Sequence, residues 1–350
     1  MPGHDVIVIG GSAGSLEPLT TLVEGLPPDL PAAVCVTRHT SPHARNMVPL
    51  ILSKAGTLPA TEAVDGEPLR AGHIYVAPPD YHLVVISGSL WVSRSATENR
   101  FRPAIDPLFR SAAVAYGPRV VGVLLSGGQD DGTAGLWAVK QQGGIAVIQD
   151  PHEAQHPSMP RSAQTYVPVD YCLPAADLAP LLARLAHEPV TVENTPPVSE
   201  ELLMETHIAL QGNALESGLL KVGQLTPYTC PACHGALLQL KAGRFVRFRC
   251  HTGHAYSARS FLAELRETID DALWNTLRAL DESVLLMTHM AEHLRQEDPT
   301  ASTVALFMAH AQEAQQRANQ IRQMVMQRHI VPSAESQEAL PSADDELTAP

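Results

Sequence analysis

The sequence predicts an α/β protein with a doubly wound, mostly parallel sheet and helices on both faces, followed by a small metal-binding module and a helical hairpin. Two observations predict the sheet. Strand-like and helix-like segments alternate from Asp5 to Ala186, as in sheets whose parallel strands are joined by helices. The first strand candidate, Val6–Ile9, consists of four β-branched apolar residues, as expected for a strand buried on both faces.

The other elements follow along the same segment. Strand candidates are Val6–Ile9, Ala33–Thr37, His73–Ala77, Leu83–Ile86, Val120–Ser126, Ile145–Gln149 and Cys172–Leu173. Helical patterns occupy Leu16–Gly25, His43–Ser53, Asp106–Tyr116, Ala134–Gln142, Pro160–Thr165 and Ala176–His187. Short strands and turns dominate between Thr57 and Arg94, so we expect a hairpin insertion at one edge of the sheet.

The composition indicates a globular protein of about two domains. The chain has 350 residues, of which 45% are hydrophobic and 17% charged. Its net charge of -13 disfavours nucleic acids and anionic membranes as partners. The N-terminal segment lacks the features of a signal peptide, and no apolar run reaches the length of a membrane span. Together with an odd count of five cysteines, this predicts a cytoplasmic protein without membrane insertion.

A glycine-rich turn directly after the first strand carries the first candidate catalytic residue. Gly10-x-Ser12-x-Gly14 fits the nucleophile-elbow pattern, which presents a serine hydroxyl at the C-terminal edge of a sheet. A nucleotide-binding loop is the alternative, but the glycine spacing matches neither the dinucleotide fingerprint nor the P-loop. The second strand ends on Arg38-His39 and not on the acidic residue that would hold a ribose. We therefore favour a hydrolase in which His39 acts on Ser12.

The third candidate lies in a later turn of the same kind. The segment from Ser126 to Gly135 follows another buried apolar strand and holds two adjacent carboxylates, Asp130 and Asp131. Carboxylates at this place are often only helix N-caps. Because the carboxyl ends of parallel strands meet at one edge of the sheet, one of the two is better explained as the orienting acid of a Ser-His-Asp triad.

Five separated motifs together resemble the catalytic domain of the chemotaxis protein-glutamate methylesterases, the CheB family. They are Val6–Gly14, Arg38-His39-Thr40, Asn99-Arg100-Phe101-Arg102-Pro103, Ser126–Gly135 and Ser158-Met159-Pro160-Arg161-Ser162-Ala163. The resemblance covers about Asp5 to Ala186. It implies hydrolysis of glutamate γ-methyl esters on chemoreceptor-like proteins, releasing methanol, and glutamine deamidation would use the same chemistry. No cofactor is expected for catalysis.

The resemblance also implies roles for single residues. The family serine corresponds to Ser12 and the family histidine to His39, and the family aspartate directly precedes a glycine, which selects Asp131. Glycines let backbone approach a ligand closely, so we expect the amides of Ala13 and Gly128 to bind the oxyanion. Ser15 and the Gly127–Gln129 stretch depart from the family pattern, which affects the shape of the cleft. The catalytic strand starts at residue 6, so we expect no receiver domain ahead of it.

Beyond the sheet, the chain is expected to divide into several parts. We predict a methylesterase catalytic domain at 1–188, a Pro-containing linker at 189–226 in which Ser199–Leu210 can form a short helix, a zinc-ribbon-like module at 227–257, a helical hairpin at 258–329 and a disordered acidic tail at 330–350.

The module carries metal-ligand spacing. A Cys-x2-Cys pair is followed at zinc-ribbon distance by Cys250-His251-Thr252-Gly253-His254. We expect a closed, structural zinc site, and buried cysteines without metal are the alternative. The predicted ligands are Cys230, Cys233, Cys250 and His254, with His251 and His234 in reserve for the fourth position.

Two long helical patterns, about Ser257–Arg295 and Thr300–Arg328, follow the module. Their apolar residues recur at alternating three- and four-residue steps, which favours packing of the two helices on each other; a surface for a signalling partner is the alternative. The module and the first helix resemble a tail found on free-standing members of the same family. The competing hypothesis for function is therefore an adaptor that binds partners through the zinc module and these helices.

Overall fold

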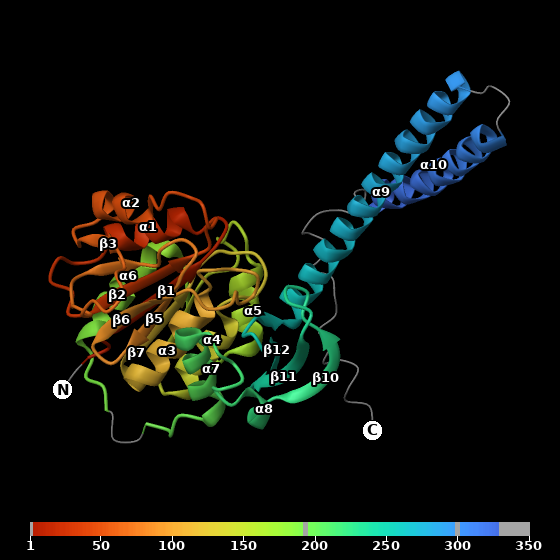
Figure 1. Ribbon diagram of the computed structural model, residues 1–350. Helices are drawn as coiled ribbons and strands as arrows, with labels where there is room; N and C mark the ends of the chain where they lie inside the picture. The colour runs from red at the N-terminus through yellow and green to blue at the C-terminus, as the bar shows by residue number, and fades with distance from the viewer. Residues whose placement is uncertain (1–2, 192–194, 298–301, 329–350) are drawn as a thin grey trace. The chain divides into compact units, whose positions relative to one another are not determined.

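The computed structural model describes residues 3–191, 195–297 and 302–328, and the chain forms two compact units, Met1–Leu262 and Ala263–Pro350. The first unit is built on a seven-stranded sheet in which every neighbouring pair is parallel (Figure 1). In spatial order its strands are β3 (Ala60–Glu62), β4 (Ile74–Val76), β2 (Ala33–Arg38), β1 (Val6–Gly11), β7 (Val120–Leu124), β8 (Ile145–Gln149) and β9 (Tyr171–Leu173). The predicted fold class is confirmed.

Helices cover both faces of this sheet, because β1 is apolar on both. Val6 and Val8 join one core cluster, while Ile7 and Ile9 point the opposite way and join another. The first cluster includes residues of α3 (Ile105–Tyr116), α4 (Thr133–Gln141) and α5 (Ser158–Tyr166). The second includes residues of α1 (Leu16–Glu24), α2 (Val48–Ala55) and α6 (Ala175–His187).

Two details differ from the sequence-based expectation. The segment 57–94 adds β3 and β4 to the main sheet, whereas β5 (His82–Ile86) and β6 (Ser89–Ser93) pair only with each other as a separate antiparallel hairpin. The apolar side chains of Leu83 and Val85 are buried in the core cluster that contains α3, which explains why this hairpin packs on a helix. Helix α2 begins at Val48 and not at His43, with Pro49 in its first turn, where the missing N–H costs nothing.

The segment expected to be a linker contains packed structure. Helix α7 (Glu200–Gln211) is capped by Ser199, whose hydroxyl accepts the backbone N–H of Leu202 at 3.2 Å. Met204 and Ile208 of α7 are buried together with Leu219 of the short α8 (Leu219–Val222). Residues 200–222 are therefore part of the first unit and not an extended connector.

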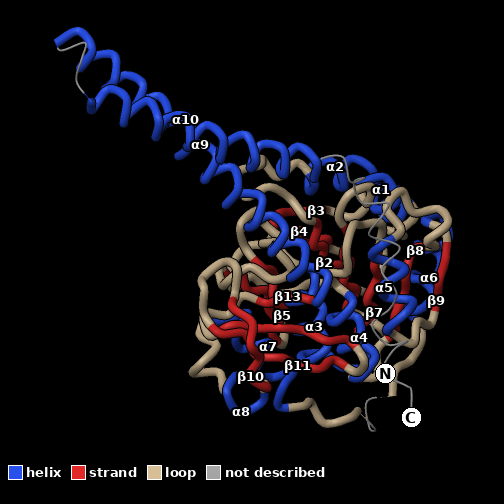
Figure 2. The backbone as a smooth tube through the Cα atoms, turned by 90° about the vertical axis from the view of Figure 1, so that its right-hand side faces the viewer, coloured by secondary structure: helices blue, strands red, loops and turns tan. Residues whose placement is uncertain are grey.

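A four-stranded antiparallel sheet follows, in the order β10 (Gln224–Thr229), β11 (Ala236–Ala242), β12 (Phe245–Cys250) and β13 (Ala255–Ser257) (Figure 2). Strands β11 and β12 form a hairpin, and the positive φ of Gly243 suits its tight turn. The three-residue strand β13 was not predicted. We refer to residues 224–257 as the Cys/His module.

Two helices, α9 (Ala258–Glu297) and α10 (Ser302–Arg328), make up the described part of the second unit, apart from the first turn of α9. Arg322 of α10 donates to Asp281 of α9 at 2.9 Å, and Leu277 and Ala318 are buried, as expected for helices that pack on each other. Ile269, an apolar residue of α9, remains 43% exposed. The predicted acidic tail lies outside the described residues. None of the described helices combines the length and the apolar character needed to cross a bilayer.

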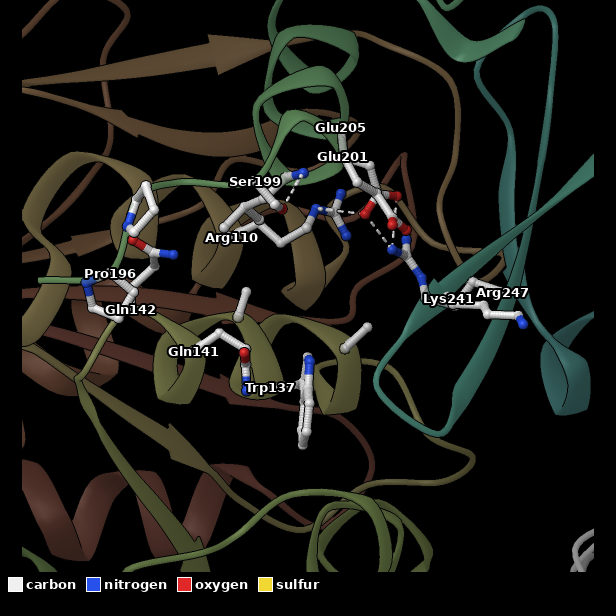
Figure 3. Close-up of a pocket in the computed structure, with 14 residues that line it drawn as sticks. Arg110, Trp137, Gln141, Gln142, Pro196, Ser199, Glu201, Glu205, Lys241 and Arg247 are labelled. Carbon is white, nitrogen blue, oxygen red and sulfur yellow. Dashed lines mark hydrogen bonds and ion pairs between the residues drawn. The ribbon is translucent and has the colours of Figure 1, made fainter. Parts of the chain in front are cut away.

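Within the first unit, a buried ion cluster joins the catalytic-domain segment to the Cys/His module. Glu205 of α7 accepts hydrogen bonds from Arg247 at 2.6 Å and from Arg249 at 2.9 Å, both on β12. Glu98 accepts from Arg249 at 2.8 Å and from Arg110 of α3 at 2.7 Å. A cavity of about 310 Å³ lies beside the cluster, and Figure 3 shows Arg110 and Arg247 converging on Glu205 at its edge.

Removing one charge from this cluster should strongly destabilise the first unit. We expect Glu205→Gln to cost about 3–5 kcal/mol of unfolding free energy, because Arg247 and Arg249 lose a buried counter-charge. The measurement is the urea midpoint and slope. Glu200→Gln, an exposed position on the same helix, is the control and should change stability by about 1 kcal/mol or less. Equal losses of stability in Glu205→Gln and Glu200→Gln would contradict the conclusion that the buried ion cluster stabilises the first unit.

The same contacts predict acid sensitivity. Burial alone would raise the pKa of Glu205, but Arg247 and its neighbours lower it from 4.5 to about 2. A carboxylate with a lowered folded-state pKa stabilises the fold above its unfolded-state pKa, and this stability is lost as the pH falls through the folded-state value. The stability that ionised Glu205 adds relative to Glu205→Gln should therefore shrink from about pH 4.5 downwards.

Candidate active site

Ser12 lies at the C-terminal end of β1, in the centre of the parallel sheet. Its backbone N–H donates to the carbonyl of Ser126 at 3.0 Å, which ties it to the turn after the neighbouring strand β7. Ser15, just ahead of α1, donates its hydroxyl to the carbonyl of Ser12 at 2.6 Å. Strand order reverses here, since β2 lies on one side of β1 and β7 on the other, and such reversals are where open α/β sheets bind ligands.

His39 directly follows β2 and faces the serine. Its backbone N–H donates to the carbonyl of Gly11 at 3.1 Å, and its Nδ1 lies 3.0 Å from the Oγ of Ser12. The imidazole is stacked on the ring of Phe101, with a centroid distance of 3.6 Å and an interplanar angle of 11°. The stacked ring and the backbone contact together hold the imidazole beside the hydroxyl.

Asp131, in the turn after β7, completes a continuous chain of hydrogen bonds. Its Oδ2 lies 2.7 Å from His39 Nε2 and accepts the backbone N–H of Ile105 at 2.7 Å. Its Oδ1 accepts the side-chain amide of Asn99 at 2.8 Å. Burial alone would raise the pKa of Asp131, but these bonds, with that from His39 first among them, hold it below its usual value. An ionised Asp131 accepts the Nε2 proton of His39, which leaves Nδ1 free to accept from Ser12.

The neighbouring Asp130 has a different environment. Its carboxylate accepts the hydroxyl of Ser257 from β13 at 2.7 Å, and burial raises its pKa to about 6. The structure thus brings together Ser12, His39 and Asp131, as the sequence predicted, and places Asp130 in a contact with the Cys/His module.

The two predicted oxyanion donors lie on different turns next to the serine. Ala13 is exposed and lines the cleft. In the other turn, the backbone N–H of Gly127 already donates to the carbonyl of His156 at 2.9 Å. The N–H of Gly128 is therefore the candidate donor to the oxyanion. A side chain at Gly127 would place its Cβ 2.6 Å from the Cε of Met159 and 3.0 Å from the Cβ of Ser12, so it would require Met159 to move and would crowd the nucleophile.

A cleft of about 540 Å³ opens over this site. Ser12, Ala13 and His39 line it together with Arg38 at the end of β2 and with Arg100 and Arg102 of the loop before α3. Arg102 is held by Asp80, to which it donates at 2.6 and 2.9 Å. The rim of the cleft is therefore rich in positive charge.

Sequence reasoning missed the roles of Asn99 and Phe101. Asn99 contacts Asp131, and Phe101 stacks on His39. Both belong to the Asn99–Pro103 motif, which was identified as a family-like stretch without a function for its residues. The signal that could have found them is the position of this motif just before α3, whose N-terminal amide at Ile105 also contacts Asp131.

The four predicted metal ligands lie together in the Cys/His module. The ligand atoms of Cys230, Cys233, Cys250 and His254 are all within 4.8 Å of one another. The Sγ atoms of Cys233 and Cys250 are 3.6 Å apart, and the Nδ1 of His254 lies 3.5 Å from the Sγ of Cys250. Zn–S bonds of about 2.3 Å in a tetrahedron imply a separation of about 3.7 Å between sulfurs, so the donor set fits zinc. The reserve residues His251 and His234 are not part of this cluster.

Comparison with known proteins identifies the sheet domain. Residues 7–182 match the family described as CheB methylesterase. The chain belongs to the CheB methylesterase family. The resemblance drawn from five sequence motifs is thereby confirmed, and the match ends before the Cys/His module begins.

Relatives and a solved structure agree with this assignment. A relative from Leptospira interrogans is 36% identical over 183 residues, which are 52% of this chain and 95% of that protein. "Protein-glutamate methylesterase/protein-glutamine glutaminase 2" of Anaeromyxobacter dehalogenans is 38% identical over 181 residues, 52% of this chain and 53% of that protein. The crystal structure of the Thermotoga maritima CheB methylesterase catalytic domain superposes with a TM-score of 0.51 and 31% identity, covering 52% of this chain and 98% of that one.

Proposed function

We propose that this CheB family member is a protein-glutamate methylesterase that hydrolyses glutamate γ-methyl esters on chemoreceptor-like proteins to glutamate and methanol. The observation that carries the proposal is the hydrogen-bonded chain from Ser12 through His39 to Asp131 at the carboxyl edge of the sheet. The names of the relatives support it and add deamidation of protein glutamine, which proceeds through the same acyl-enzyme.

We infer a task for each group from these contacts. His39 Nδ1 takes the proton of Ser12 as Oγ attacks the ester carbonyl, while Asp131 holds the Nε2–H and stabilises the imidazolium. The amides of Ala13 and Gly128 are the proposed donors to the oxyanion. The imidazolium then protonates the leaving oxygen, methanol departs, and His39 activates a water that hydrolyses the acyl-enzyme and regenerates Ser12.

The charge of the cleft supports the proposed substrate class. Arginines line the cleft above the triad, and a substrate whose reacting glutamate lies among other carboxylates is attracted to such a surface. A methylated, glutamate-rich helix of a chemoreceptor-like protein has this character, and the cytoplasmic location expected from the sequence suits such a partner. The C-terminal helices remain a predicted surface for a signalling partner; Leu285 and Leu286 are exposed there.

We also propose that Cys230, Cys233, Cys250 and His254 hold a structural zinc ion. Four protein donors at tetrahedral separations close the coordination sphere and leave no position for a substrate. The ion would join the β10–β11 turn to the β12–β13 turn and stabilise the module. The competing adaptor hypothesis is less favoured, because binding alone would not require a complete triad.

Substituting the nucleophile tests the proposed reaction. Ser12→Ala should abolish methanol release from membranes that contain methylated receptors, because no acyl-enzyme can form. The fold should be intact, as judged by circular dichroism, since Ser12 holds its neighbours through its backbone. Methanol release by Ser12→Ala at the wild-type rate would contradict the proposal.

The two adjacent aspartates provide a matched pair. Asp131→Asn should lower kcat by about 10⁴-fold, because the amide cannot hold His39 in the required tautomer. Asp130→Asn keeps an acceptor for Ser257 and should lower kcat by less than about tenfold. Steady-state methanol release measures both, and equal losses would reject the assignment of Asp131.

Metal analysis tests the zinc site. The purified protein should contain one molar equivalent of zinc, and Cys230→Ser should lose it and lower the stability of the module, because the free energy of binding a structural zinc ion contributes to folding. His251→Ala, outside the cluster, is the control and should retain the metal. Full zinc content in Cys230→Ser, or loss of zinc from His251→Ala, would show that the ligand set is wrong.

A further inference from the structure

The loop that supports the triad is itself held by the Cys/His module. Ala255 of β13 donates its N–H to the carbonyl of Thr97 at 3.2 Å, and its carbonyl accepts the N–H of Asn99 at 2.8 Å. Asn99 and Arg100 both have positive φ, a conformation that costs energy in residues other than glycine and persists only when neighbours impose it. The strand β13 therefore pairs with a strained loop that leads directly to the triad.

The side chain of Asn99 continues this connection into the site. Its Nδ2 donates to Asp131 at 2.8 Å and to Asp106 at 3.0 Å. Its Oδ1 accepts the backbone N–H of Ser257 at 2.9 Å and the hydroxyl of Ser260 at 3.1 Å. All four bonding positions of the amide are thus used, two toward buried carboxylates and two toward the start of α9.

The two serines are also the N-cap of α9. Ser257 accepts the N–H of Ser260 on its hydroxyl at 2.9 Å, and its own N–H lies 2.8 Å from the hydroxyl of Ser260. The hydroxyl of Ser257 donates onward to Asp130 at 2.7 Å. The cap of one helix therefore contacts both the aspartate next to the catalytic one and the asparagine that binds the catalytic one.

Relatives show that this arrangement is an addition to the family fold. The 183 aligned residues make up 95% of the Leptospira protein, so it has no room for a counterpart of the Cys/His module. The Thermotoga catalytic domain is likewise covered to 98% by about half of this chain. The sheet domain exists elsewhere without the module, whereas here the module supplies polar partners to the site.

Resting on the proposed esterase function, we infer that Asn99 is a positioning residue for Asp131 and that Ser257 and Ser260, at the junction of the Cys/His module with α9, hold Asn99 in place. The module then does more than stabilise the fold. It fixes the acid of the triad, and through it the orientation of His39, from a segment more than 120 residues away in the chain.

The side-chain hydrogen bonds that lead from Ser260 through Asn99 to Asp131 can be tested in the full-length protein. Asn99→Ala removes the donor to Asp131, and we expect kcat for methanol release to fall about 10- to 100-fold with KM changed by less than about twofold. Ser260→Ala, which leaves the loop and every backbone N–H intact, should lower kcat by a smaller factor. Because Ser260 acts through Asn99, the double variant should be no slower than Asn99→Ala alone.

A spectroscopic signal separates positioning from general damage. The proton between His39 Nε2 and Asp131 should give a low-field ¹H resonance in the wild type, which weakens or shifts in Asn99→Ala and Ser260→Ala. Asn213→Ala, whose side chain caps only the turn at Glu216, is the control and should match the wild type in both kcat and resonance. This resonance does not require turnover, so it remains informative if the protein proves not to be an esterase.

The outcomes are distinct. Absence of Ser12-dependent methanol release in the wild type overturns the proposed function, and the resonance alone then tests the role of Asn99. A kcat for Asn99→Ala within about twofold of wild type, with an unchanged resonance, overturns the inference. Effects of Asn99→Ala and Ser260→Ala that multiply in the double variant also overturn it, since they would show that Ser260 acts independently of Asn99. If Asn99→Ala does not fold, an unchanged kcat and resonance in Ser260→Ala overturns the inference.

Discussion

The site depends on keeping one fully buried carboxylate ionised. Asp131 is almost completely removed from solvent, and a buried charge of this kind persists only when hydrogen-bond donors replace the lost water. Donors come from three directions: the imidazole of His39, the first amide of α3 at Ile105, and the side chain of Asn99. The sheet positions the turn that carries Asp131, and α3 directs the positive end of its dipole toward the Asp131 carboxylate. The loop of Asn99 covers the remaining side of this carboxylate. The order of strands, the start of α3 and the contact with β13 all serve this requirement.

The junction between the sheet domain and the Cys/His module is polar at its centre. Arg247 and Arg249 are two residues apart on β12, so their side chains leave the strand on the same face and meet Glu98 and Glu205 there. A slip of one residue in the pairing of β12 would turn both guanidinium groups to the opposite face, and Arg110 alone in this cluster would then face the two glutamates. Apolar side chains would tolerate such a slip more easily, because their attraction is not directional. The ion cluster thus defines the register in which β13 reaches the Asn99 loop.

Local features of the sequence were sufficient to predict the sheet domain, Ser12 and His39, whereas the choice of Asp131 over Asp130 came from the family resemblance. Each of these features is recognisable from a few neighbouring residues: the apolar run at Val6–Ile9, the glycines around Ser12, and the position of His39 directly after a strand. The cluster of three cysteines and His254 was predictable for the same reason, since the spacing of these residues indicated that they lie together. The packing of α7 could not be predicted, because its segment begins with prolines and shows weak periodicity. The helix is buried only by contact with distant elements. The role of Asn99 depends on an acceptor contact with Ser257, 158 residues away, which no local pattern reveals.

The stacking of Phe101 on His39 restricts the route of proton transfer through the imidazole. The phenyl ring of Phe101 lies 3.6 Å from the imidazole and nearly parallel to it, so it blocks rotation of His39 about the Cβ–Cγ bond: a turning imidazole would have to sweep through the volume that the phenyl group fills. The two nitrogens therefore cannot exchange places during a catalytic cycle. The proton received from the serine must be delivered to the departing oxygen from the same ring edge, and water that regenerates the enzyme must enter along the path by which the alcohol leaves.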